Sequence, residues 1–157
     1  MNQVSEVVGL KRLERLAIFL RALPRKRFDY NRWVGRDWKG SQDLSCGTKA
    51  CALGWAATIP SFRREGLCLI NNSWKDYGEL VGEAEVGLRN MKTGRFASSF
   101  SMSSGAIFFG IDTSDAMYLF APNINEDEMT PKQVAKKIEK FVRVRRLQRK
   151  RAESGDE

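Results

Sequence analysis

Leucines recur three or four positions apart near the start of the chain. Between residues 5 and 23 they mark one face of a predicted amphipathic helix, which should end before Pro24 because proline cannot continue it. The leucines of this face are Leu10, Leu13, Leu16, Leu20 and Leu23. A second stretch, residues 48–58, is rich in Ala and Leu and predicts a short buried helix that ends before Pro60. Gly54 within it indicates close backbone packing, since glycine otherwise costs roughly 1 kcal/mol there relative to Ala.

The second half of the chain carries the signals of further helices. Residues 104–121 predict two helices joined at Gly110, which takes a left-handed turn conformation, with Asp112 or Ser114 beginning the second helix. Residues 130–133 (TPKQ) have the form of a capping box with proline in the first turn. The helix that follows should bury one apolar stripe, which consists of Val134, Ile138, Phe141, Val142 and Leu147.

Short apolar runs between these helices predict a small amount of β-structure. Residues 66–70 (GLCLI) and 85–89 (EVGLR) are the strand candidates. Earlier in the chain, Asp29 is predicted to cap a short helix, and residues 35–46 have the composition of a loop. That short helix should turn three apolar side chains toward the core, namely Phe28, Trp33 and Val34.

Together these elements predict an α+β fold: a predominantly helical single domain with a small β-strand pair and a long basic C-terminal helix. The chain has 157 residues, of which 42% are hydrophobic, and a chain of this size buries about two thirds of its surface. We expect one globular domain over residues 1–151 and a disordered acidic tail over residues 152–157. No apolar run is long enough to span a membrane and the first residues lack the pattern of a secretory signal, so we expect a cytoplasmic protein.

The cysteine and histidine content narrows the chemistry. Histidine is absent, which excludes Ser-His and Cys-His catalysis and every metal site that contains histidine. The cysteines are three in number (Cys46, Cys51 and Cys68), and an odd count predicts reduced thiols and no disulfide. A structural zinc site needs four ligands, which these cysteines do not supply, so no metal or other cofactor is expected.

The positive charge is concentrated toward the end of the chain. The net charge is +8, yet residues 130–151 alone carry ten lysines or arginines and one acid, Glu139, whereas residues 51–129 are acidic at −4. Like charges at this density repel one another, and a bound anion relieves that repulsion. The alternative is that these basic residues bind no partner and only increase the solubility of the protein. The basic residues predicted to bind nucleic acid are Lys136, Lys140, Arg143, Arg145, Arg146, Arg149, Lys150 and Arg151.

An earlier stretch combines basic and aromatic residues and is predicted to stack bases beside that helix. It covers residues 25–39 and includes Arg32, Arg36 and Trp38, with Tyr30 and Lys39 as further members.

The turn at residues 45–49 is a separate candidate site, and two functions are possible for it. Small residues leading into a helix present free backbone N–H groups that can hold a phosphate, and Lys49 would add charge; plain helix capping is the simpler alternative. The residues of this candidate phosphate site are Ser45, Cys46, Gly47, Thr48 and Lys49. Cys46 directly before a helix could also be an activated thiol, although only Asp43, Lys49 or a distant carboxylate is present as a base.

Several segments together resemble a family of small uncharacterised proteins of phages and bacterial genomes. The segments are FDYNRW (28–33), CGTKACALGWA (46–56), IPSFRREGL (59–67), AIFFGI (106–111), AMYLF (116–120) and TPKQVAKKIEKF (130–141). The resemblance extends over residues 10–142, and CGT-x-AC-x-x-GWA is its most specific part. It implies a phage or prophage context, hence an accessory or host-modulating factor in the host cytoplasm.

We therefore expect a binding protein rather than an enzyme, with an anionic partner and no membrane. Nucleic acid, or a protein–nucleic acid assembly, is the first candidate. The alternatives are a protein that sequesters a small phosphorylated ligand, such as a nucleotide signal, through residues 45–49, and a thiol-dependent enzyme that uses Cys46. The sequence leaves the oligomeric state open.

Overall fold

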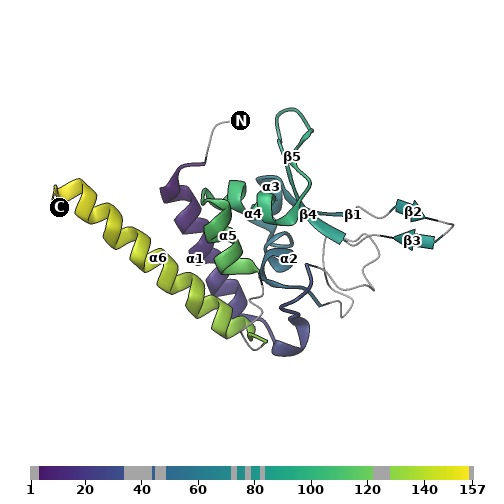
Figure 1. The fold of residues 1–157 in the computed structure, drawn as a ribbon, viewed down its shortest axis with the longest axis horizontal. Helices are drawn as coiled ribbons and strands as arrows, with labels where there is room; N and C mark the ends of the chain where they lie inside the picture. The colour runs from purple at the N-terminus through teal and green to yellow at the C-terminus, as the bar shows by residue number, and fades with distance from the viewer. Residues whose placement is uncertain are drawn as a thin grey trace.

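The computed structural model describes residues 4–33, 44, 49–71, 74–76, 79–81, 84–121 and 128–155, with the backbone alone for 74–76 and 79–81. Its long C-terminal helix, α6 (Pro131–Ser154), lies beside α1 (Glu6–Ala22) at one side of the molecule (Figure 1). The shorter helices occupy the middle, and the strands lie on the side away from α6 (Figure 1). The predicted α+β, mostly helical architecture is confirmed.

The first predicted helix forms with the predicted end. The Ser5 side chain caps α1 by accepting a hydrogen bond of 3.4 Å from the Val8 N–H, and the helix ends before Pro24. Leu13, Leu16 and Leu20 have no exposed surface. They form the base of the core, because their spacing places them on one face of the helix. A short 3₁₀ helix, η1 (Arg25–Arg27), follows.

The region after η1 differs from the prediction. Asp29 caps no helix among the described residues: its side chain accepts a hydrogen bond of 3.1 Å from the Asn31 N–H, and its own N–H donates to the Ala50 carbonyl at 3.0 Å. Phe28 forms a β-bridge with Ala50, and this extended pairing is incompatible with a helix there. Phe28 is buried and Trp33 half-buried as expected, while Val34 lies outside the described residues.

The Ala-rich segment forms α2 (Ala52–Ala56), all of whose residues are buried. A Cβ added to Gly54 would lie 1.7 Å from the Trp33 carbonyl oxygen, so the predicted close backbone packing is confirmed. Helix α3 (Pro60–Arg64) follows directly and buries Phe62.

Both predicted strands form and pair with each other. In the part of the chain that is described, β1 (Leu67–Asn71), β4 (Ala84–Arg89) and β5 (Phe96–Ser98) make an antiparallel sheet in the order β1-β4-β5. Leu67 stands opposite Leu88, and both side chains face the core. Two short strands that the sequence did not predict, β2 (Trp74–Asp76) and β3 (Glu79–Val81), pair separately.

The helix–turn–helix prediction is confirmed by α4 (Ser101–Phe109) and α5 (Thr113–Phe120). Gly110 between them has φ 60°, in the left-handed region, and Asp112 caps α5 by accepting a 2.7 Å hydrogen bond from the Asp115 N–H. The centre of the core is an aromatic cluster, whose members are Phe62, Phe108, Phe109 and Phe120.

Helix α6 begins with the predicted capping box. The Thr130 hydroxyl accepts from the Gln133 N–H at 3.2 Å, and the Gln133 side chain accepts from the Thr130 N–H at 2.8 Å. The helix continues to Ser154, past the expected boundary at 151, because Gly155 ends it in a left-handed conformation (φ 69°). Leu147 was expected in the buried stripe and is 52% exposed, so that assignment is wrong: at about 100° per residue it lies on the opposite side of α6 from the buried Ile138.

Candidate nucleic-acid interface

One side of α6 is anchored to the body of the protein. Val134, Ala135 and Ile138 have no exposed surface. The antiparallel α1 lies beside them, and the Arg21 guanidinium donates two hydrogen bonds of 2.6 Å to the Glu139 carboxylate. The hydrogen bonds from Arg21 lower the pKa of Glu139, so this acid stays ionised and is committed to α1.

Three of the eight basic residues predicted to bind nucleic acid are held by acidic side chains. The ion pairs are Arg145–Asp115, Arg146–Glu14 and Arg149–Glu153. The Arg146 pair is bidentate, at 2.6 and 2.8 Å, and joins α6 to α1. These arginines therefore have a structural role, and their charge is already balanced locally.

The other five form what we call the outer basic stripe, made of Lys136, Lys140, Arg143, Lys150 and Arg151. All five are exposed, and none forms an ion pair with any residue that the structure describes. At 3.6 residues per turn they fall within about 100° of the helix circumference, and at 1.5 Å per residue they extend over about 22 Å. The structure thus gathers the unbalanced charge of α6 on one outward strip.

Helix α1 carries two further exposed basic residues. Lys11 and Arg15 are exposed, and Arg15 donates a hydrogen bond of 2.9 Å to the Ser61 hydroxyl of α3. Helix α1 thus contacts α6 through Glu14 and α3 through Arg15. The charge count of the sequence pointed only to the chain ends and did not single them out.

The predicted aromatic–basic stretch is only partly described. Tyr30 is 3% exposed and donates its hydroxyl to the Ala121 carbonyl at 3.3 Å, so it belongs to the core and is not exposed for stacking on bases. The Arg32 side chain is 40% exposed and lies 4.0 Å from the Asp29 carboxylate. Arg36, Trp38 and Lys39 lie outside the described residues, so their role stays a prediction.

The candidate phosphate turn falls almost wholly outside the described residues. Of its members only Lys49 is placed, and it is exposed; residues 45–48, with Cys46, are not described. Cys51 and Cys68 are free thiols. Burial raises the pKa of Cys51 to about 11, which keeps this thiol protonated and unreactive at neutral pH. Among the described residues, no group of three or more potential metal ligands occurs.

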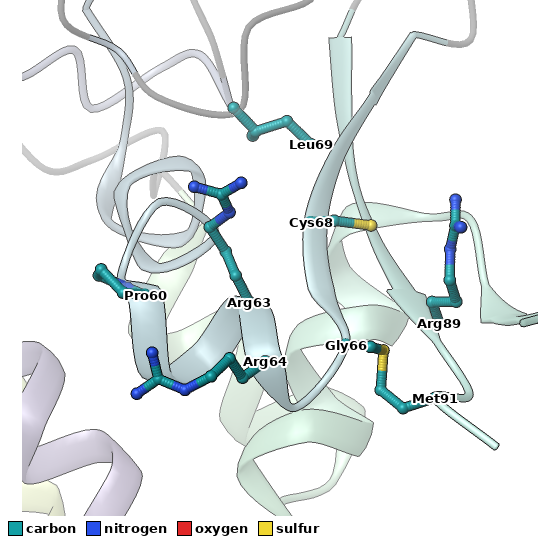
Figure 2. Close-up of a pocket in the computed structure, with 8 residues that line it drawn as sticks. All are labelled: Pro60, Arg63, Arg64, Gly66, Cys68, Leu69, Arg89 and Met91. Carbon is teal, nitrogen blue, oxygen red and sulfur yellow. The ribbon is translucent and has the colours of Figure 1, made fainter.

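A further basic site was missed by the sequence analysis. Arg63 and Arg64 at the end of α3 and Arg89 at the end of β4 line an open groove of about 650 Å³ (Figure 2). All three belong to the segment 51–129, whose net charge is negative. The net charge of this segment therefore gave no sign of a basic site. The basic site could have been predicted from the pairing of the two predicted strands. That pairing places residue 89 next to residue 66, and hence near the two arginines of α3.

No helix within the described ranges combines the length and apolar character needed to cross a bilayer. Comparison of the chain with protein-family models, with curated proteins and with solved structures finds no match. A function for this chain therefore has to be argued from the geometry of its own residues.

Proposed function

We propose that this protein binds nucleic acid through the outer basic stripe of α6, by contacts to the phosphate backbone. The observation that carries the proposal is the separation of charge on this helix. Three arginines are neutralised by acids on α1, α5 and α6 itself, while the five cations of the stripe are exposed and form no ion pair with a described residue.

The spacing of the stripe suits a polyanion. Five charges over about 22 Å are on average about 5–6 Å apart along the helix axis, whereas each DNA strand presents one phosphate per about 3.4 Å of helix axis. Several side chains can therefore reach phosphates at once. Each contact releases condensed counterions, and the stripe loses the repulsion between its own like charges.

The composition of the stripe favours recognition without sequence preference. Lys136, Lys140 and Lys150 present compact ammonium charges on flexible stems, which contact phosphates as point charges. Phosphate contacts position a protein on nucleic acid and carry no sequence information directly. The resemblance to small phage and bacterial proteins extends the proposal to an accessory or host-modulating role in a bacterial cytoplasm.

The test compares two variants with the same net charge. One changes Lys136 and Lys140 of the stripe to Gln; the control changes Lys92 and Arg95, which are exposed in the turn between β4 and β5, to Gln. Titration of labelled duplex and single-stranded DNA and RNA by fluorescence anisotropy measures the affinity at several salt concentrations. The stripe variant should lose about 1.8 units of the log–log salt slope for duplex DNA, at 0.9 per contact.

The control variant should keep its slope within one unit. A second control changes Glu14 and Arg146 together to Gln, which leaves the net charge unchanged and should have little effect on binding. Equal losses in the stripe variant and the first control would mean that net charge alone drives binding. A stripe variant that folds and binds like the parent would overturn the proposal.

A further inference from the structure

The groove lined by Arg63, Arg64 and Arg89, which we call the arginine groove, is a second concentration of positive charge. It lies between α3 and the β1–β4 pair, with Leu69 and Met91 as apolar lining (Figure 2). Figure 2 shows Arg63 and Arg89 on opposite sides of β1 and the Cys68 thiol directed toward the side of Arg89. Its volume of about 650 Å³ is within the range of about 300–1,000 Å³ that is usual for small-molecule sites.

A tight turn at Gly66 joins the end of α3 to the end of β4. Gly66 has φ 106°, its N–H donates to the Arg63 carbonyl at 3.0 Å, and its carbonyl accepts from the Arg89 N–H at 2.9 Å. A Cβ at this position would lie 2.1 Å from the Arg89 carbonyl oxygen, so only glycine fits. The backbone of the end of α3 is thereby fixed to the backbone of the end of β4.

Among the described residues that line the arginine groove there is no acid. None of its three arginines forms an ion pair with a residue in the described part of the chain, and the neighbouring Glu65 is already paired with Arg12 of α1. Arg89 additionally lies with its guanidinium carbon 4.9 Å from the centre of the Phe96 ring. The positive charge in the groove is therefore unbalanced within the described structure.

Two of these arginines affect the pKa of the half-buried Cys68 thiol. Burial is the largest influence and raises its pKa, while the charges of Arg89 and Arg63 lower it. The positive charges of both guanidinium groups thus act on the same side chain of β1, Cys68. An anion bound between them would remove this lowering effect and make the thiol less acidic.

We infer that the arginine groove binds a small ligand with two or more phosphoryl groups, which Arg63 and Arg89 contact from opposite sides of β1. Guanidinium groups match phosphoryl oxygens with paired hydrogen bonds, and more than one of them suits a multiply charged phosphate better than a single carboxylate. Met91, which is exposed at the rim of the groove, would contact the organic part of the ligand. A nucleotide has this combination of a charged end and an apolar, flat body.

This site is separate from the outer basic stripe. In Figure 1, α6 lies on one side of α1, and α3, β1 and β4 lie on the other. A phosphoryl group could also be the terminal phosphate of a nucleic acid, so the experiment distinguishes the two sources. Failure of the groove proposal would leave the proposed nucleic-acid binding by α6 untouched, and the reverse also holds.

The test follows alkylation of Cys68 by iodoacetamide, measured on the Cys68 peptide by mass spectrometry, together with calorimetric titration. The probes are ADP, pyrophosphate, adenosine and a 5′-phosphorylated oligonucleotide. ADP should slow the alkylation and adenosine should not. Changing either Arg63 or Arg89 to Gln should weaken ADP binding about tenfold or more, and Arg89→Lys should restore part of it.

The matched control is the variant with Lys136 and Lys140 changed to Gln, which should bind ADP like the parent. Met91→Glu adds a negative charge at the groove and should also weaken ADP binding, which provides a test that leaves every arginine in place. Equal protection by adenosine and ADP, or ADP binding unchanged in both arginine variants, would overturn the proposal. Protection by the oligonucleotide alone would assign the groove to a nucleic-acid end instead.

Discussion

At the scale of single residues, Gly54 is packed most closely against the backbone of Trp33. The carbonyl of Trp33 occupies the space where a Cβ would stand, 1.7 Å from its ideal position. In an ordinary helix a change from glycine to alanine stabilises by up to about 1 kcal/mol. Here Gly54→Ala should instead lower the unfolding free energy, since the chain near Trp33 or α2 has to move. Denaturant unfolding gives the sign.

The matched control is Gly94→Ala. Gly94 has φ 70° and no atom within 4 Å of its ideal Cβ position, so only the backbone conformation opposes the substitution. Gly54→Ala should cost more than Gly94→Ala. A stabilised Gly54→Ala protein would show that α2 is not packed in this way.

Trp55 combines burial with a hydrogen bond. It is 6% exposed, its indole N–H donates to the Arg27 carbonyl at 2.8 Å, and its ring lies 5.9 Å from that of Phe19. Trp55→Ala should therefore cost about 3–5 kcal/mol of unfolding free energy, as large aromatic truncations in cores do. Phe100, which is 70% exposed, provides the control, and Phe100→Ala should change stability little. Similar unfolding midpoints for the two variants would contradict this placement.

The burial of an aromatic residue could be predicted from the sequence where the residue lies within a predicted helix. It could not be predicted for aromatic residues outside such helices. Trp55 lies in the stretch predicted to form a buried helix, and it is in the core. Tyr30 was expected on the surface because it lies among basic residues. Its burial depends on the chain near Ala121, some ninety residues later, which accepts the hydroxyl hydrogen bond, and no local pattern reports such a contact.

At the scale of elements, the basic residues of α6 divide into arginines held in ion pairs and cations that face solvent. The composition of the helix alone does not separate the two groups. Its start, its capping box and its buried valines and isoleucine follow from local signals. Which arginines are neutralised depends on acids from other helices, Glu14 and Asp115, that are distant in sequence. The eight predicted residues therefore divide into a paired and an unpaired group only when α1 and α5 are in place.

The junction of α1 and α6 should depend on pH through Glu139. Its pKa is lowered in the folded state by the hydrogen bonds from Arg21. A lowered carboxyl pKa contributes stability above the unfolded value of about 4.3, and this contribution is lost as the pH falls through the folded value. The double-mutant coupling between Arg21→Gln and Glu139→Gln, measured from unfolding free energies, should be favourable at neutral pH and smaller near pH 3. A coupling that does not change with pH would contradict the ion pair.

At the scale of the whole molecule, unbalanced positive charge is found in two places that the sequence presents very differently. The outer basic stripe is one continuous segment, so its charge is evident from the residue order. The arginine groove joins positions 63, 64 and 89 from an acidic segment through a strand pairing and a glycine turn. Charge counts along the chain detect the first kind of site and average out the second.

The measurement that tests the central claim most directly is the salt dependence of DNA binding by the intact protein. If the five cations of the outer basic stripe contact phosphates, log affinity for duplex DNA should fall linearly with log salt, with a slope of about −4 to −5 at 0.9 per contact. Between about 50 and 200 mM salt this amounts to a loss of at least a hundredfold. An affinity that is independent of salt over that range, or no binding at the lowest salt, would contradict the proposed function.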